Sequence, residues 1–213
     1  MTERFLRTGL LAGVLLLPLA LVGCGGVSAD STGRALYGSC ETCHGASGEG
    51  DLRVDAPAIA GMPAWYVSSQ LQRFQAGLRG KHPDDREGLR MRAMLLQMLT
   101  KAEIDLVASH VAALPPAAKR EPALGGDPKV GAVPFQICAA CHGQKGEGNQ
   151  QMNAPPLAGM EDWYVARQLR KFQTGVRGRN PEDVIGMQMA GMAMAVPADD
   201  VDDVAAYVHG LSR

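Results

Sequence analysis

Two short segments of this chain hold the residue types that could do chemistry. A Cys-x-x-Cys-His pattern begins the segment CETCHGASGEG, and it returns 98 residues later at the start of CAACHGQKGEG. The residues of the two patterns are Cys40, Cys43, His44, Cys138, Cys141 and His142. Thiols and an imidazole at this spacing could form a redox pair, bind a metal ion or attach a haem.

Three of the four possible uses of this pattern lack support elsewhere in the chain. A thioredoxin-like redox pair needs a βαβ setting, and no such pattern is visible. A structural zinc ion needs four ligands, whereas each segment has no third cysteine nearby, and two disulfides would not require the histidines. The pattern therefore predicts c-type haem attachment, in which both thiols bind the porphyrin and the adjacent histidine becomes the proximal iron ligand.

The two segments belong to a duplication. Between residues 37 and 94, 27 of the 58 positions are identical to those 98 residues later, including AGM, WYV, QL, FQ and RG. Two copies of this length indicate tandem domains rather than a solenoid of short repeats. The Pro- and Gly-rich stretch LPPAAKREPALGGDP then predicts an extended and fairly stiff connector between them.

The first residues read as an export signal. Arg4 and Arg7 precede an uncharged apolar run, residues 9–23, which is short for a transmembrane helix. The run ends in LVGC, which resembles a bacterial lipobox, so Cys24 is predicted to be lipidated; the alternative is an ordinary secretory signal with Cys24 incidental. Lipidation would account for the fifth cysteine, which is otherwise an unpaired thiol in an oxidising compartment. Gly25 after the cysteine favours the outer membrane by the rule for bacterial lipoproteins.

These features give a domain plan. We expect a signal peptide over residues 1–23, a tether over 24–30, domains over 31–114 and 128–213, and a linker over 115–127. A hydrophobic content of 46% and a charged content of 20% indicate a globular protein. The net charge of −1 gives no sign of a nucleic-acid partner. Aromatic residues make up only 5%, and a covalently held porphyrin would fill the small cores.

The predicted secondary structure is helical throughout. Pro63 is expected in the first turn of a helix that ends near Gly77. Thr100 and Glu103 form a capping-box pattern before a helix with one apolar face. That face comprises Ile104, Val107, Val111 and Leu114 in the first copy, and Val201, Val204, Val208 and Leu211 in the second.

On these motifs both halves resemble class I cytochrome c domains, and the tandem is similar to dihaem cytochromes c of the c-four type. The resemblance implies two covalent haem c groups and an all-α fold. It also implies a methionine as the sixth iron ligand, which maps to Met91 and Met189. A proline carbonyl, from Pro57 or Pro155, is implied as the partner of the free nitrogen of each proximal histidine.

The methionine positions are the least certain, because each copy offers several. Only Met91/Met189 and Met94/Met192 keep the 98-residue offset, since a one-residue slip follows them. We prefer the first pair, with the second as the alternative. Methionine near an apolar helix is usually core filler.

Other repeated or polar residues receive ordinary interpretations. The histidines His82, His110 and His209 have no counterpart in the other copy, so each is expected on the surface or within a helix. The segments around Arg79 and Arg177 are interpreted as capped loops, with contact to haem propionates as the alternative. Trp65 and Trp163 are expected in the core near the porphyrin.

An iron that has histidine at one axial position and methionine at the other has no open site for a substrate. This ligation favours an electron carrier over an enzyme. The resemblance implies redox partners such as a quinol-oxidising cytochrome complex and a terminal oxidase or reductase. The rivals are a dihaem peroxidase, a thiosulfate-oxidising cytochrome and a fixed subunit of a respiratory complex. Two similar domains disfavour the peroxidase, and the lack of a spare cysteine in either half disfavours the thiosulfate enzyme. We expect an exported protein in the periplasm, anchored to a membrane through Cys24.

Overall fold

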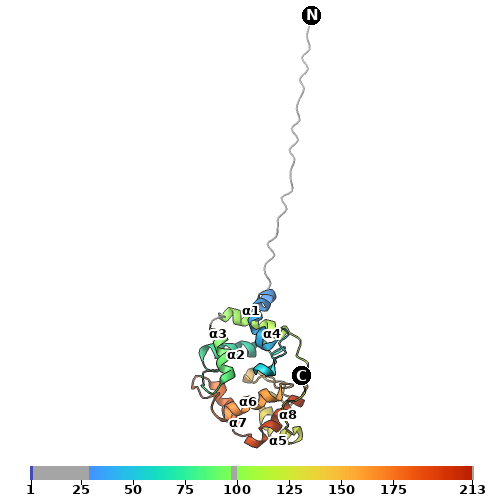
Figure 1. The fold of residues 1–213 in the computed structure, drawn as a ribbon, viewed down its shortest axis with the longest axis vertical. Coiled ribbons are helices and arrows are strands. Elements are labelled where there is room, and N and C mark those ends of the chain that lie inside the picture. The colour runs from blue at the N-terminus through green and yellow to red at the C-terminus, as the bar shows by residue number, and fades with distance from the viewer. Residues whose placement is uncertain (2–28, 97–99, 213) are drawn as a thin grey trace.

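The computed structural model describes Met1, residues 29–96 and residues 100–212, so the signal segment and Cys24 lie outside the described residues. Within the described ranges the chain is helical and has no β-strand. Figure 1 shows two lobes, one from blue to green and the other from yellow to red. The predicted all-α tandem is confirmed. No helix in the described part of the chain has the length and apolar character needed to cross a membrane.

The two lobes repeat one order of elements. The first comprises α1 (Ala29–His44), η1 (Leu52–Val54), α2 (Ala64–Ala76), α3 (Arg86–Leu96) and α4 (Lys101–Ala113). The second comprises α5 (Pro128–His142), η2 (Gln150–Met152), α6 (Asp162–Gln173), α7 (Val184–Ala193), η3 (Ala198–Asp200) and α8 (Val201–Gly210). In each lobe the first and last helices pack on each other, as α1 on α4 and α5 on α8.

The start of α4 follows the predicted capping box. The Thr100 hydroxyl accepts from the Glu103 backbone N–H at 3.3 Å, and the Glu103 carboxylate accepts from the Thr100 N–H at 2.7 Å. The apolar face behind this cap is buried, as predicted for Ile104, Val107 and Val111. The capping box therefore marks the residue at which this helix begins, and the apolar stripe marks the side that it buries.

The ends of α2 also follow the sequence, with one shift. Pro63 lies just before the helix, as its N-cap, rather than within the first turn. Gly77 ends the helix in the left-handed region at φ +72°, and its N–H bonds to the Arg73 and Phe74 carbonyls. A glycine is favoured there because a side chain is strained at positive φ.

Glycine also permits the close crossing of the first and last helices. A Cβ on Gly33 of α1 would lie 2.5 Å from the Leu106 carbonyl oxygen of α4. In the second lobe a Cβ on Gly131 would lie only 1.9 Å from the Asp203 carbonyl oxygen of α8. The backbones approach each other too closely for any larger residue.

The connector over residues 114–127 has no helix, as predicted. It is held by the second lobe. The Asp162 carboxylate accepts from the Ala123 and Leu124 N–H groups at 3.0 and 2.6 Å. One ring nitrogen of His209 lies 2.9 Å from the Arg120 carbonyl oxygen. The connector is therefore extended but bound along part of its length.

Candidate functional site

Each proximal histidine stands at the C-terminal end of a helix and meets a proline carbonyl. His44 ends α1 and is 8% exposed, and its Nδ1 lies 2.8 Å from the Pro57 oxygen. His142 ends α5 and is 6% exposed, and its Nδ1 lies 2.8 Å from the Pro155 oxygen. A carbonyl can only accept, so Nδ1 carries the proton and Nε2 keeps its lone pair for a metal ion.

Burial lowers the pKa of both histidines, and the hydrogen bond to the proline carbonyl opposes this effect only in part. The rings are therefore held in the neutral form near pH 7. Neutral imidazole is the form that binds a metal ion.

A glycine turn brings each proline back to its histidine. The Gly50 N–H donates to the His44 carbonyl at 2.8 Å, and the equivalent bond from Gly148 to His142 is 2.7 Å. A Cβ on Gly50 would lie 2.4 Å from the Ala58 nitrogen, and the residue has φ +75°. The repeated Gly-Glu-Gly run thus ends in a glycine because the returning backbone passes over it.

The four cysteines of the two motifs form no disulfide, and they lie on α1 and α5 just before the histidines. Burial raises the pKa of the Cys40 and Cys138 thiols. A raised pKa disfavours the thiolate that a zinc site or a reactive redox pair needs. Among the described residues there is also no cluster of three or more histidine, cysteine or acidic side chains that could hold a metal ion.

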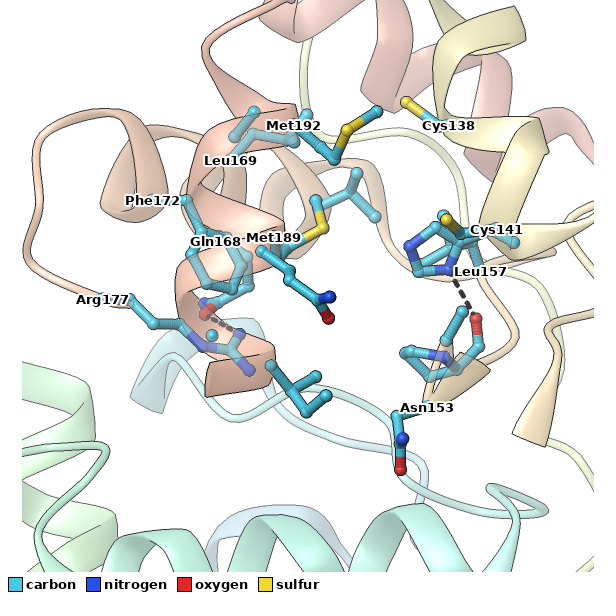
Figure 2. A pocket seen from close by; sticks show the side chains of 18 of the residues that line it. Cys138, Cys141, Asn153, Leu157, Gln168, Leu169, Phe172, Arg177, Met189 and Met192 are labelled. Atoms are coloured by element: carbon cyan, nitrogen blue, oxygen red, sulfur yellow. Dashed lines mark hydrogen bonds between the residues drawn. The ribbon is translucent and has the colours of Figure 1, made fainter. Parts of the chain in front are cut away.

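An apolar cavity opens in the second lobe beside Cys138, Cys141 and His142. In Figure 2 the two cysteines lie on one side, while Met189 points into the cavity from the opposite side, on α7. Apolar side chains such as Leu157, Leu169 and Phe172 form much of the wall. Three residues of the first lobe, Tyr66, Gln70 and Arg73, complete the lining.

The two candidate methionine pairs occupy different positions on their helices. Met91 and Met189 are partly buried and pack against the cores of their own lobes. Met94 and Met192 are 46% and 40% exposed. Met192 borders the cavity of the second lobe as Met189 does, so both candidate methionines of the second copy line this cavity. The packing supports the first pair as the residues held in a fixed position.

Two partly buried arginines meet between the lobes, where capped loops were predicted. Arg79 donates to the Gln70 amide oxygen at 2.9 Å, and across the boundary to Tyr164 and Gln168 at 3.0 and 3.2 Å. Arg177 donates to Gln168 at 2.9 Å, as Figure 2 shows, and across the boundary to Gln70 at 3.0 Å. These segments form the interface between the lobes.

The hydrogen-bond acceptors just named are neutral amide and phenol oxygens. Burial, and then the charge of Arg79, lower the pKa of Arg177 to about 10. Burial alone would raise the pKa of Tyr164, but the two guanidinium charges outweigh it and bring the value below its usual range. Two positive charges close together at a partly buried site favour an anion beside them.

The histidines that have no counterpart in the other copy, and the tryptophans, follow the expectation only in part. His110 and His209 lie within helices, as predicted, but both are buried rather than on the surface. Trp163 is buried and Trp65 only partly so. Neither tryptophan borders the cavity of the second lobe; their neighbours Tyr66 and Tyr164 do.

Sequence reasoning missed the interface role of four residues, Gln70, Gln168, Tyr66 and Tyr164. The signal was present, because the WYV, QL and RG identities recur at the 98-residue offset. In a duplicated chain, polar residues kept in both copies can serve a contact between the copies as well as a site within each.

The residues fit a haem at each of the two motifs. Two thiols, a neutral imidazole oriented by a carbonyl, and in the second lobe a cavity with apolar walls and a methionine opposite form the donor set that a c-type haem uses. The partly buried Arg177, which lines the cavity, suits the carboxylates of a porphyrin.

Comparison with known proteins gives the same assignment. The model of the family described as "Cytochrome c" matches residues 31–115 and 130–212. Cytochrome c4 of Azotobacter vinelandii is 29% identical over 209 residues, which cover 92% of this chain and 96% of that protein. A protein of Stutzerimonas stutzeri (strain A1501) named "Thiosulfate dehydrogenase electron acceptor" is 32% identical over 185 residues, 82% of this chain and 80% of that one.

A solved structure extends the comparison. The thiosulfate dehydrogenase TsdBA of Marichromatium purpuratum superposes with a TM-score of 0.71 at 29% identity. The likeness covers 86% of this chain but only 40% of that protein.

Proposed function

This chain belongs to the cytochrome c family as a dihaem protein of the cytochrome c4 type, and we propose that it is an electron carrier between redox proteins outside the cytoplasm. It binds two covalently attached haem c groups, which supply one-electron redox chemistry when present. The observation that carries the proposal is the repeated pairing of a buried, carbonyl-oriented histidine with a partly buried methionine.

In this proposal each set of residues has one task. Cys40, Cys43, Cys138 and Cys141 hold the porphyrins by thioether bonds. His44 and His142 bind iron through Nε2, and the carbonyls of Pro57 and Pro155 fix the ring plane and make the imidazole a better donor. Met91 and Met189 complete the axial pair. The chain thereby closes both axial positions and leaves no place for a substrate.

The two partly buried arginines of the interface are proposed to neutralise haem propionates. Arg79 and Arg177 have neutral hydrogen-bond partners, and Arg177 borders the cavity of the second lobe. A propionate entering there would supply the missing negative charge. For Arg79 and Arg177 we therefore propose contact with haem propionates, which was the alternative interpretation of their segments in the sequence.

The partners follow from chemistry and from the relatives. One similar protein is named as the electron acceptor of a thiosulfate dehydrogenase. We propose a donor of that kind or a quinol-oxidising cytochrome complex, and a terminal oxidase or reductase as acceptor. Lipidation of Cys24 would keep the carrier at a membrane, with the outer membrane preferred. Cys24→Ser should move the protein from the membrane fraction to the soluble periplasmic fraction; an unchanged distribution would remove the anchor from the proposal.

The rival is an enzyme, since a similar solved structure is a thiosulfate dehydrogenase. In our sequence argument, an enzyme of that type replaces one axial methionine by a cysteine. All four cysteines of the two domains belong to the haem-attachment motifs. A peroxidase needs an axial position that opens to peroxide. Both activities are therefore tested by asking whether either iron has an exchangeable site.

The deciding experiment follows the oxidised holoprotein by visible spectroscopy with and without cyanide or peroxide. We expect the weak far-red band of methionine-bound ferric haem, slow cyanide binding and no peroxide turnover. Met91→Ala and Met189→Ala should each remove about half of that band, because each removes one of two ligands. Met94→Ala and Met192→Ala are the matched controls and should leave it. Rapid turnover of peroxide or thiosulfate would establish the enzyme instead.

A further inference from the structure

Several ion pairs cross between the lobes, and two of them repeat each other at the 98-residue offset. Arg73 of α2 binds the Asp183 carboxylate of the second lobe. Lys171 of α6 binds the Asp85 carboxylate of the first lobe, with Nζ 2.5 Å from Oδ1. Arg73 and Lys171 are equivalent positions of the two copies, and so are Asp85 and Asp183. Each lobe therefore gives a cation to the other and receives one from it.

Both carboxylates also cap a helix. Asp183 is the N-cap of α7, and its Oδ1 accepts from the Gly186 N–H at 2.8 Å. Asp85 stands just before α3, and its Oδ1 accepts from the Gly88 N–H at 3.1 Å. A Cβ on Gly186 would lie 2.1 Å from the Asp183 carboxylate. Glycine at this position thus lets the carboxylate close tightly on the first turn.

The capped helices are the two that carry the candidate methionine ligands. Met91 lies on α3 and Met189 on α7, each six positions beyond its aspartate. Six residues span about 9 Å along a helix axis. A shift in the first turn of so short a helix is carried directly to the methionine.

The aspartates are buried, at 2% and 3% exposure for Asp85 and Asp183. A buried carboxylate is costly unless it is both paired and hydrogen-bonded. Here the hydrogen bond comes from the aspartate's own helix and the positive charge from the other lobe. Without that charge, the carboxylate would have to turn toward water and leave the helix end uncapped.

We infer that Arg73 and Lys171 are reciprocal positioning residues, each of which fixes, from the opposite lobe, the start of the helix that presents the axial methionine. The inference rests on the proposed methionine ligation, and it holds for either methionine pair, because both pairs lie on α3 and α7. Docking of the lobes thereby stabilises both axial ligands. A change at one lobe's cation should be detected at the other lobe's haem.

The two halves of this arrangement differ in the cation, which is Arg73 in one and Lys171 in the other, and in one further carboxylate. Lys171 also binds the Glu87 carboxylate of α3 at 2.7 Å, whereas the equivalent position on α7 is Ile185. Burial alone would raise the pKa of Glu87, but hydrogen bonds, first that from Lys171, and the charges of Lys171 and Arg167 together lower it. The first turn of α3 is therefore held by two carboxylates on Lys171, one of which also pairs with Arg167 at 3.8 Å, and that of α7 by one carboxylate on Arg73.

The test uses holoprotein in which only one haem keeps a methionine. Met91→His leaves the far-red methionine band to the second haem, and Met189→His leaves it to the first. We expect R73Q to weaken the band and speed cyanide binding about tenfold in the Met91→His background, a typical size for coupling between sites. K171Q should do the same in the Met189→His background. Neither should act in the other background.

Cyanide binding is followed because loss of a nearby positive charge would by itself shift a reduction potential without opening the iron. R53Q and R170Q are charge-matched controls on exposed pairs within single lobes, and they should behave as the parent protein does. R73K and K171R keep the cation and should restore slow binding. If R73Q fails to load haem, D183N removes the charge but keeps a capping oxygen, and the same direction of change is expected at the second haem.

The outcomes separate the two proposals. If Met91→His and Met189→His do not each remove part of the band, the proposed axial ligands are wrong. If they do, but R73Q and K171Q act on their own lobe's haem, on both haems equally or on neither, the reciprocal positioning is wrong.

Discussion

The C-terminal helices of the two lobes begin and end differently, although the two haem motifs are nearly superimposable in their contacts. His44 and His142 each meet a proline carbonyl at 2.8 Å. By contrast α4 begins with a full capping box, whereas Asp200 before α8 makes no side-chain cap bond. Near the end of α8, His209 contacts the connector, and the matching residue of α4 is Ala112.

The difference follows from what each region contacts. The parts that face a haem face the same chemical group in both lobes, so the two copies keep the same residues there. The connector leaves one lobe and enters the other, so no symmetry relates its two ends. Asp162 and His209 of the second lobe bind it.

The cores show a second asymmetry. The buried cluster of the first lobe consists of first-lobe residues only. The cluster of the second lobe includes Met62 of the first, with Tyr66 and Val67 packed against it. The second lobe therefore depends on the first for part of its apolar burial, and the reverse dependence is weaker.

The largest expected effect is on haem content and folding, and it is measured by removing the haem attachment of one lobe at a time. Replacing both haem-attaching cysteines of one lobe by serine should reduce the covalent haem content from two to one, measured by mass spectrometry. Loss of haem in the first lobe (C40S/C43S) should also loosen the second, because Met62 and Tyr66 would no longer be held in place. C138S/C141S should leave the first lobe folded. Equal damage to both lobes in the two variants would contradict the asymmetry of the cores.

A smaller effect is expected at the helix crossings. Gly131→Ala should lower the free energy of unfolding by about 1–3 kcal/mol, since its new Cβ would meet a backbone carbonyl. Gly33→Ala should cost less, because the equivalent gap is wider, 2.5 Å against 1.9 Å. Urea unfolding of the holoprotein measures both. Gly38→Ala, on α1 with open space around it, is the control and should be neutral or slightly stabilising.

His209→Ala should act on the second lobe and the connector only. The change removes both ring nitrogens from the Met160 and Arg120 carbonyls, which lie at 3.0 and 2.9 Å. Loss of partners for buried carbonyls costs about 1–3 kcal/mol. We also expect faster proteolysis within residues 114–127. His82→Ala, at a partly exposed site, should change neither measurement, and unchanged proteolysis of His209→Ala would mean that the connector is held by other contacts.

The smallest effect is expected on stability when the residues that precede the last helices, Thr100 before α4 and Asp200 before α8, are replaced. Thr100→Ala should lower the free energy of unfolding by about 1 kcal/mol, because it removes the capping hydroxyl of α4. Asp200→Ala should cost less, since Asp200 has no capping bond to lose. Thermal unfolding of the two variants gives the comparison, and a larger loss for Asp200→Ala would reverse it.

The residues that bind haem could be read from the sequence because their chemistry is local. Thiol, thiol and imidazole must follow one another within one helical turn, and the glycine that lets the chain fold back lies only six residues beyond His44. The capping box at Thr100 and the apolar face of α4 are local for the same reason. The 98-residue repeat then indicated two sites and reduced the candidate methionines to two pairs, Met91/Met189 and Met94/Met192.

The contacts between the lobes were decided by the tertiary structure alone. Arg79, Arg177, Arg73 and Lys171 stand in segments whose local pattern is that of polar loops and helix surfaces. Their burial depends on which faces of two separate lobes meet, and that depends on surface shape summed over many residues rather than on any spacing along the chain. His110 and His209 were expected on the surface or within a helix; both lie within helices, and their burial was decided by tertiary packing for the same reason.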